Sequence, residues 1–274
     1  MSNIYTFNLP KRPAFEMEYY YSKDNREYDA RIFPAHVHDT LEFYVLIEGD
    51  VSFVVETGVY RLMPGDVLVT KPNEIHNCVL NTPSVHKHLC FWFNPDDEFL
   101  LSAFLSHPFG EGNLIRPSTE EKTKLLALYE ELYKASENKD QKTQYVSVLQ
   151  ILQTFEKNAP LLSQNGVIPN VLKEILDDIN ENFKEINSLE YFLDKYFISR
   201  STLTRLFKKY LHSSPKAYLE TKRLAYSRTL LKEGSSVLDA CSKAGFPDYS
   251  NYIRLFKTRF SMTPKQYQSQ AKDD

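Results

Sequence analysis

The sequence predicts a multidomain protein in which an all-β N-terminal barrel with flanking helices precedes an all-α C-terminal domain with two helix-turn-helix motifs. Three observations support this prediction. Residues 1–115 hold short strand patterns separated by turn signals, nearly the same phrase occurs twice in the last third of the chain, and the charge changes sign between the two halves.

The composition is that of a globular chain. Its 274 residues suffice for two ordinary domains, and 42% hydrophobic with 25% charged residues excludes a disordered chain. No apolar run approaches 18 residues and the N-terminus lacks the apolar core of a signal peptide, so we expect no membrane partner. The three cysteines are scattered, as in a protein of the reducing cytoplasm.

Charge is distributed unevenly along the chain. Residues 1–164 hold 15 Lys and Arg against 23 Asp and Glu, a balance of −8, whereas residues 165–274 hold 18 against 13, a balance of +5. Within 195–265 the count is 15 against 4, a balance of +11. A basic segment inside an acidic protein indicates a polyanion partner for that segment, although a solvated lysine-rich surface would give the same count.

Residues 1–115 have the pattern of a β-barrel or sandwich. The stretch LEFYVLIEGDVSFVVETGVYRLMPGDVLVT is rich in Val, Phe, Tyr and Ile and is interrupted by three glycine-containing turns. A further strand pattern covers His86–Phe93. Small barrels of this kind can enclose a ligand cavity, so we assign residues 1–115 to a ligand-sensing domain.

Residues 116–158 change to a helical pattern. A capping box at 118–121 opens a helix that runs to about Ser136, and a second helix spans roughly Asp140–Asn158. These two amphipathic helices could cover the barrel or form a homodimer, and the sequence does not choose between the two uses. Residues 159–169 are bounded by prolines and contain a glycine, which predicts a linker.

The C-terminal region, 170–270, is helical throughout. An apolar stripe runs from Val171 to Phe183, and further helices are expected at 188–196, 199–210, 215–233, 236–244, 248–259 and 264–270. Pro215 and Pro264 each follow Ser or Thr, the arrangement of a helix N-cap followed by proline at the first helical position.

The repeated phrase is FKKYLHSSPKAYL at 207–219 and FKTRFSMTPKQYQ at 256–268, 49 residues apart. Each copy ends a predicted helix-turn-helix, whose second helix would enter a DNA major groove with its polar face outward. Leu203, Leu206, Phe207 and Tyr210 are expected to face the core in the first copy, and Tyr252, Leu255 and Phe256 in the second. The candidate DNA-binding residues are Arg200, Ser201, Thr204, Arg205, Lys208, Tyr249, Ser250, Asn251, Arg254 and Lys257.

The stretch AGFPDYSNYIRLFKTRFSMTPKQY resembles the signature of the AraC/XylS transcription regulators, and the resemblance spans about 170–270. It implies two helix-turn-helix units joined by a long helix, about 215–233, that place their recognition helices in successive major grooves of duplex DNA. Three positions depart from the family pattern. His212 and Ser261 replace a usual glycine, which bears on the local turn, and Gln268 stands where arginine is common, which bears on one phosphate contact.

The N-terminal stretch FPAHVHDTLEFYVLIEGD, with the later His76, resembles the metal-binding motif of cupin barrels. On a strand, His36 and His38 would share one face. Three imidazoles and the Glu42 carboxylate suit Zn²⁺, Ni²⁺, Fe²⁺ or Mn²⁺. However, KPNEIHN lacks the glycine and spacing that enzymatic cupins usually show. We therefore favour no metal and no cofactor, with these residues lining a polar pocket; if metal were present, His36, His38, Glu42 and His76 would be its ligands.

The sequence thus predicts a cytoplasmic, ligand-responsive transcription regulator that is not an enzyme. Its partners would be promoter DNA, a small effector that is sugar-like by family resemblance, a second copy of the chain, and RNA polymerase if it activates. Tyr44, His88 and Trp92 join the four residues above as candidate ligand-binding residues, with core packing as the alternative role. Two other functions remain open: a metal-dependent cupin enzyme with a basic helical appendage, and a structural protein that binds nucleic acid without sequence preference.

Overall fold

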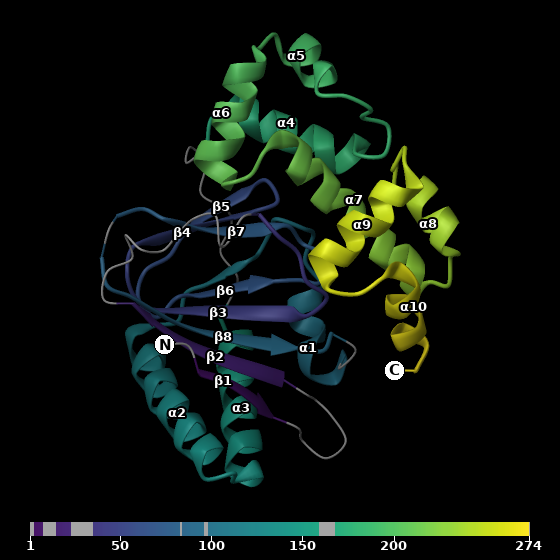
Figure 1. The fold of residues 1–274 in the computed structure, drawn as a ribbon. Coiled ribbons are helices and arrows are strands. Elements are labelled where there is room, and N and C mark those ends of the chain that lie inside the picture. The colour runs from purple at the N-terminus through teal and green to yellow at the C-terminus, as the bar shows by residue number, and fades with distance from the viewer. Residues whose placement is uncertain are drawn as a thin grey trace. The chain divides into compact units, whose positions relative to one another are not determined.

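The computed structural model describes residues 3–7, 15–22, 35–82, 84–95, 98–158 and 168–273 (Figure 1). These residues form two compact units. One unit, which we call the β domain, consists of the described residues of 1–33 and 38–167. The other unit, which we call the helical domain, consists of the described residues of 34–37 and 168–274. The predicted linker lies mostly outside the described residues. Among the described helices, none is both long and apolar enough to cross a membrane.

The strands of the β domain pair into antiparallel sheets. Within the described residues, one sheet has the order β1-β2-β8-β3-β6-β9 and the other has the order β5-β4-β7. The strands are β1 (Asn3–Phe7), β2 (Phe15–Ser22), β3 (Leu41–Glu48), β4 (Val51–Val55), β5 (Gly58–Arg61), β6 (Val67–Thr70), β7 (His76–Leu80), β8 (His86–Phe93) and β9 (Leu114–Ile115). This arrangement confirms the predicted β-rich N-terminal domain.

Alternation along β3 divides the apolar side chains between two cores. Tyr44 and Leu46 point between the sheets, where they pack with Phe53 of the facing sheet. Phe43 and Val45 point to the opposite side of the larger sheet, where helices cover them. The inner face of the larger sheet is therefore the face that meets the smaller sheet, and side chains on it are candidates for lining a ligand site.

Helices α2 (Thr119–Glu137) and α3 (Gln141–Glu156) pack on the outer face of the larger sheet. The predicted capping box is present, because the Ser118 hydroxyl accepts from the Glu121 amide while the Glu121 carboxylate accepts from the Ser118 amide. Leu132 and Phe155 are fully buried in the core shared with the strands. These two helices therefore use their apolar faces to cover the sheet.

The prediction of β structure throughout 1–115 was wrong in one place. Residues Glu98–Leu105 form helix α1, and its Leu101 and Phe104 are buried in the core that α2 and α3 share with the sheet. The spacing of three between these two side chains places them on one face of a helix. A helix of eight residues between strands has too short an apolar pattern to be separated from a strand by periodicity.

The helical domain follows the predicted order closely. Its helices are α4 (Asn170–Asn182), α5 (Glu190–Tyr196), α6 (Arg200–Leu211), α7 (Pro215–Lys232), α8 (Val237–Lys243), α9 (Tyr249–Phe260) and α10 (Pro264–Asp273). Ser199, Ser214 and Asp248 accept backbone hydrogen bonds as N-caps. Local signals fixed these boundaries well because each cap satisfies amides that the helix itself leaves without partners.

The two glycine replacements do not prevent the expected turn. His212 ends α6 with φ of +47°, and Ser261 ends α9 with φ of +56°. Both residues lie in the left-handed region, where a side chain costs roughly 1–2 kcal/mol that glycine does not. The family turn is therefore retained in this chain at a conformational cost.

Candidate functional site

Helix α6 presents a polar, basic face to solvent. Arg200, Ser201, Arg205 and Lys208 are exposed and Thr204 is half-buried. With Lys209, all five line an open depression on the surface of the helix. The buried residues are Leu203, Phe207 and Leu211, whereas Leu206 and Tyr210, which were expected to face the core, are half-buried. The outward face thus carries the residue types that contact phosphates and base edges.

Helix α9 presents a less basic face. Tyr249, Ser250, Arg254 and Lys257 are exposed, and Asn251 is half-buried. Tyr252 and Phe256 are fully buried. The Arg254 guanidinium donates to the Asn251 amide oxygen at 2.7 Å. The two candidate base-reading groups of this helix therefore hold each other in place.

Arg200 has an acidic neighbour in its own helix-turn-helix. Its guanidinium forms an ion pair with the Glu190 carboxylate at the start of α5. Both side chains are more than half exposed, 58% and 56%. Because exposed ion pairs are worth little, this contact orients the arginine without preventing it from reaching DNA.

Part of the positive balance of 195–265 is not on the surface. Arg223 is 6% exposed and donates to the backbone oxygens of Phe183 at 2.9 Å and Ile186 at 2.7 Å. Arg228 is 2% exposed, and its guanidinium lies 4.6 Å from the centre of the Phe260 ring. These arginines hold the helical domain together, so the sequence count overstates the charge available to DNA.

Gln268 also has a structural contact. Its side-chain amide donates to the backbone oxygen of Ser235 at 2.7 Å, just beyond the end of α7. This bond satisfies a carbonyl in the turn between α7 and α8. The replacement of the family arginine thus leaves a side chain that supports this turn.

In the β domain, strand register places the candidate ligand residues on the inner face of the larger sheet. Glu42 of β3 pairs with Trp92 of β8, and Tyr44 pairs with Cys90. His88 lies two residues before Cys90 on the same face. Tyr44 is 5% and His88 9% exposed, and Trp92 is half-buried. The structure therefore brings the candidates Glu42, Tyr44, His88 and Trp92 to one wall of the larger sheet.

Glu42 joins two of the predicted histidines. Its Oε2 atom lies 3.0 Å from His38 Nε2 and 3.2 Å from His76 Nε2, and it accepts a hydrogen bond from the Thr70 hydroxyl at 3.2 Å. Burial raises the pKa of Glu42, but the two histidines outweigh it and hold that pKa well below its usual range. Contact with this carboxylate raises the pKa of His76 despite its burial.

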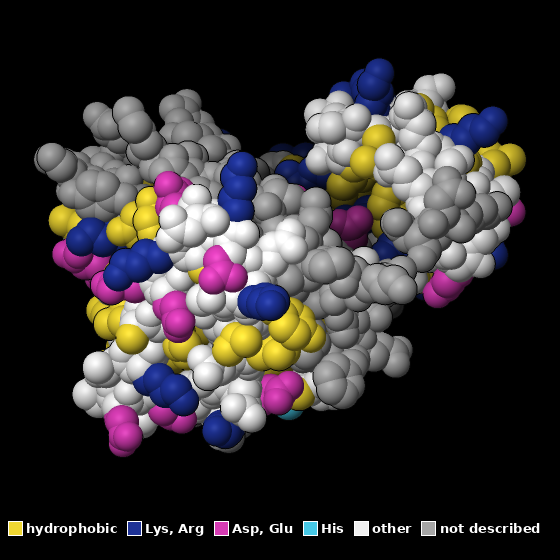
Figure 2. Space-filling model, turned by 90° about the horizontal axis from the view of Figure 1, so that it is seen from below, with side chains coloured by type: hydrophobic (Ala, Val, Ile, Leu, Met, Phe, Trp, Pro, Cys, Tyr) yellow, Lys and Arg dark blue, Asp and Glu magenta, His cyan; other side chains and the backbone are white. Residues whose placement is uncertain are grey.

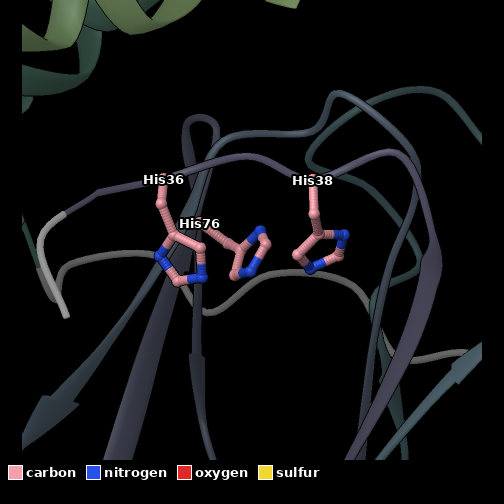
Figure 3. A group of neighbouring side chains, drawn as sticks. All are labelled: His36, His38 and His76. Carbon is pink, nitrogen blue, oxygen red and sulfur yellow. The ribbon is translucent and has the colours of Figure 1, made fainter. Parts of the chain in front are cut away.

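His36 completes a group of three imidazoles (Figure 3). One ring nitrogen from each of His36, His38 and His76 lies within 4.8 Å of the others. The rings of His38 and His76 meet edge-on, with centroids 4.9 Å apart. One detail of the prediction was wrong: His36 and His38 precede β3 and do not belong to a regular strand. The histidines gather because this loop lies beside the start of β7.

A second histidine pair lies on the inner wall. His86 Nε2 lies 2.7 Å from the Tyr44 hydroxyl and 3.1 Å from His88 Nδ1. Tyr20 of β2 stacks on the His88 ring at 4.9 Å. Burial lowers the pKa of His86 to about 4 and that of His88 to about 3, so both are neutral at pH 7. The sequence missed His86 and Tyr20 because only tertiary pairing brings β2 beside β8.

Comparison with known proteins follows the same division of the chain. The family model described as "AraC-like ligand binding domain" matches residues 24–154, and the model described as "Helix-turn-helix domain" matches residues 193–270. The HTH-type transcriptional regulator YbfI of Bacillus subtilis (strain 168) is 26% identical over 80% of this chain and 81% of its own length. The HTH-type transcriptional activator RhaS of Escherichia fergusonii is 22% identical over 85% of this chain and 87% of its own.

Solved structures also align with nearly the whole chain. ToxT from Vibrio cholerae O395 covers 98% of this chain and 96% of its own at 11% identity, with a TM-score of 0.39. Family models match both domains, and the relatives that span both domains are transcription regulators. The chain belongs to the AraC family of transcription regulators, which bind DNA and carry a ligand-binding domain.

Proposed function

We propose that the two helix-turn-helix units of this chain read one continuous, non-palindromic DNA site, and that a small molecule in the β domain controls this binding. The observation that carries the proposal is the pair of recognition helices, α6 and α9, with apolar residues inward and polar or basic residues outward. The connecting helix α7 has 18 residues. At 1.5 Å per residue it spans about 27 Å, against roughly 34 Å between successive major grooves on one face of the duplex.

The residues assigned to DNA divide by chemistry. Arg200, Asn251 and Arg254 carry side chains that can form paired hydrogen bonds with base edges. Ser201, Arg205, Lys208 and Lys257 suit phosphate oxygens. In this proposal Thr204, Tyr249 and Ser250 complete the contact surface. Such an interface neutralises several phosphates, so its affinity depends strongly on salt.

The effector of the proposal is a sugar or a related metabolite. The inner wall of the β domain combines an indole, a phenol and an imidazole, Trp92, Tyr44 and His88, with the Glu42 carboxylate. Aromatic faces suit the apolar faces of sugar rings, and the polar groups suit hydroxyls. The relatives are transcription regulators, so they give no support to the alternative of a metal-dependent enzyme.

Homodimerisation through α2 and α3 completes the proposal. Outside the apolar faces that cover the sheet, these helices expose Leu126, Tyr133, Tyr145 and Val146. In the view from below, hydrophobic side chains lie among acidic and basic ones (Figure 2). A mixed surface of this kind suits a protein interface. A dimer would place two DNA-binding domains on a promoter in the cytoplasm, with contacts to RNA polymerase if the protein activates.

Binding of the full chain to duplex DNA at increasing salt tests the DNA part. Each phosphate neutralised contributes about −0.9 to the slope of log affinity against log salt, so we expect a slope of roughly −4 or steeper. A slope near zero would contradict the proposal.

The effector part has its own optical signal. The chain has one tryptophan, Trp92, on the inner wall. A panel of sugars and related metabolites should contain a compound that changes Trp92 fluorescence and DNA affinity together. Tyr44→Phe should weaken that response, and Tyr129→Phe, in the core on the opposite side of the larger sheet, should not. A response equal in both variants would place the effector elsewhere.

A further inference from the structure

We propose that His38, Glu42 and His76 bind a divalent first-row transition-metal ion in the β domain. The sequence favours a metal-free pocket, because its second motif departs from that of enzymatic cupins. The orientation of the imidazole rings in the structure instead favours a bound metal ion. The proposal does not depend on the function proposed above.

The hydrogen-bond partners of His38 fix which ring nitrogen carries a hydrogen. Its Nδ1 lies 3.0 Å from the backbone oxygen of Thr40 and 3.1 Å from the Thr40 hydroxyl. A carbonyl oxygen only accepts hydrogen bonds, so Nδ1 is the protonated nitrogen. In the neutral ring, Nε2 then carries a lone pair, and this lone pair faces the Glu42 carboxylate at 3.0 Å.

His76 repeats this arrangement from a different strand. Its Nδ1 lies 2.9 Å from the backbone oxygen of Glu74, so Nδ1 again carries the hydrogen. Its Nε2 lies 3.2 Å from the same oxygen, Glu42 Oε2. A backbone carbonyl that holds one imidazole nitrogen is the usual support for a histidine that binds metal through its other nitrogen.

Three electron-pair donors therefore converge on one point. A carboxylate cannot donate a hydrogen to either Nε2, and a protonated Glu42 could donate to one but not to both. The remaining metal-free arrangement has two imidazolium rings around one carboxylate, although His76 is 1% and Glu42 7% exposed. Without added protons, the two Nε2 lone pairs and the carboxylate oxygen repel one another. A metal cation that binds all three donors replaces this repulsion with attraction.

The separations suit one ion. Donors that each lie about 2.0–2.2 Å from a metal are separated by roughly 3–4 Å, and the Nε2–Oε2 distances of 3.0 and 3.2 Å fit this range. One ring nitrogen of His38 and one of His76 lie within 4.8 Å of each other, so both can approach one ion. Imidazole nitrogen with one carboxylate oxygen selects zinc, nickel, iron, cobalt or manganese over magnesium and calcium.

The backbone holds the site in place before any ion binds. The amide of Asn73 donates to the backbone oxygen of His38 at 2.9 Å, which ties the loop before β3 to the loop before β7. The Thr70 hydroxyl holds Glu42 Oε2 from β6. Ligands positioned in this way lose little freedom when a metal binds, which favours affinity.

Metal binding by the full-length chain without a polyhistidine tag tests the proposal. The protein is stripped with chelator, loaded with Co²⁺ or Zn²⁺ and freed of excess by gel filtration. Bound metal is then measured by elemental analysis, and Co²⁺ coordination by visible absorption. The variants are His38→Gln, His76→Gln and Glu42→Gln, and His107→Gln removes a half-buried histidine outside the group as a control.

We expect about one ion per chain in the wild type and in His107→Gln, with a higher Tm when metal is bound, because a ligand of the folded state stabilises it. Each of the other three variants should lose at least tenfold in affinity and lose the metal-dependent rise in Tm. Far-UV circular dichroism of the metal-free variants shows whether they are folded. Absence of binding in the folded wild type, or equal binding in the folded His76→Gln variant and in the His107→Gln control, would overturn the proposal.

Discussion

The two helix-turn-helix units of this protein share several buried residues and differ at some positions of their outer faces. At positions 49 residues apart, Phe207 and Phe256 are both fully buried, and Tyr218 and Tyr267 both pack in the core. His212 and Ser261 both end their helices with positive φ. On the outer face Ser201, Arg205 and Lys208 recur as Ser250, Arg254 and Lys257, whereas Arg200 corresponds to Tyr249 and Lys209 to Thr258.

This comparison teaches how one chain can carry two readers. The buried and capping positions must satisfy packing and backbone hydrogen bonds in both units, so similar buried rings and helix ends recur in both copies. The outer positions meet solvent or DNA and can differ without disturbing the fold. The first unit therefore has the more basic face, and the second has an arginine–asparagine pair.

The largest effect should come from the turn of the second unit. Gly245 has φ of +82°, and a Cβ there would lie 2.4 Å from the backbone oxygen of Lys184. Gly245→Ala should destabilise the helical domain by roughly 2–4 kcal/mol, through strain and overpacking together. Chemical denaturation followed by far-UV circular dichroism measures this loss.

Gly234 supplies the matched control for this variant. It has φ of +89°, but an added Cβ would meet nothing within 4 Å. Gly234→Ala should cost only about 1 kcal/mol from backbone conformation. Equal losses in the two variants would show that close packing at this turn does not support the second unit.

The first unit should be sensitive to acid at a position where the second is not. Asp178 is 4% exposed and accepts hydrogen bonds from Asn182 and Tyr191, and its Oδ1 atom lies 2.9 Å from Lys195 Nζ. The equivalent residue of the second unit, 49 positions later, is Ser227. Burial raises the pKa of Asp178, but Lys195 and the other donors outweigh it and lower that pKa below 3.8. The carboxylate therefore stabilises the fold above pH 3.8, and this contribution is lost as pH falls through the lowered pKa.

Asp178→Asn should thus cost about 1–3 kcal/mol at pH 7, and its difference from the wild type should shrink below pH 4. Asp194→Asn, an exposed acid on α5, should change stability by less than about 0.5 kcal/mol. Urea denaturation at pH 7 and pH 3 makes the comparison. A difference between Asp178→Asn and wild type that is the same at both pH values would remove the charge from the explanation.

The smallest effect concerns the left-handed helix ends. Ser261→Gly should stabilise the protein by up to about 1 kcal/mol, because glycine adopts positive φ without strain. Ser242→Gly, inside α8, should destabilise it by a similar amount. Thermal denaturation resolves both changes. A destabilising Ser261→Gly would mean that the serine side chain supports this turn.

Sequence patterns predicted the helical domain better than the β domain. Pro215, Pro264 and the N-cap residues act within one helical turn, so their effect can be predicted from neighbouring residues alone. Helix α1 was missed because its apolar pattern covers only eight residues. Arg223 and Arg228 were counted with the surface charge, because a buried arginine is recognisable only from the carbonyls and rings that tertiary structure places around it.

The candidate sites divide in the same way. His36, His38, Glu42 and His76 were identified from spacing, and the structure brings them together. The backbone oxygens of Thr40 and Glu74, which orient two of these rings, come from main-chain geometry that no residue type encodes. His86 and Tyr20 depend on the pairing of distant strands. Residue type thus predicted which side chains gather here, but not the groups that orient them.

Sequencing of DNA sites selected by the full chain from a random duplex pool tests the central claim, that one chain carries two different readers. We predict two blocks of base preference within each site, about 10 base pairs apart and different in sequence. Arg200→Ala should flatten one block and Arg254→Ala the other, each by roughly 1–3 kcal/mol, while Lys208→Ala should weaken all sequences alike. A palindromic site, or loss of the same block in both arginine variants, would contradict the account.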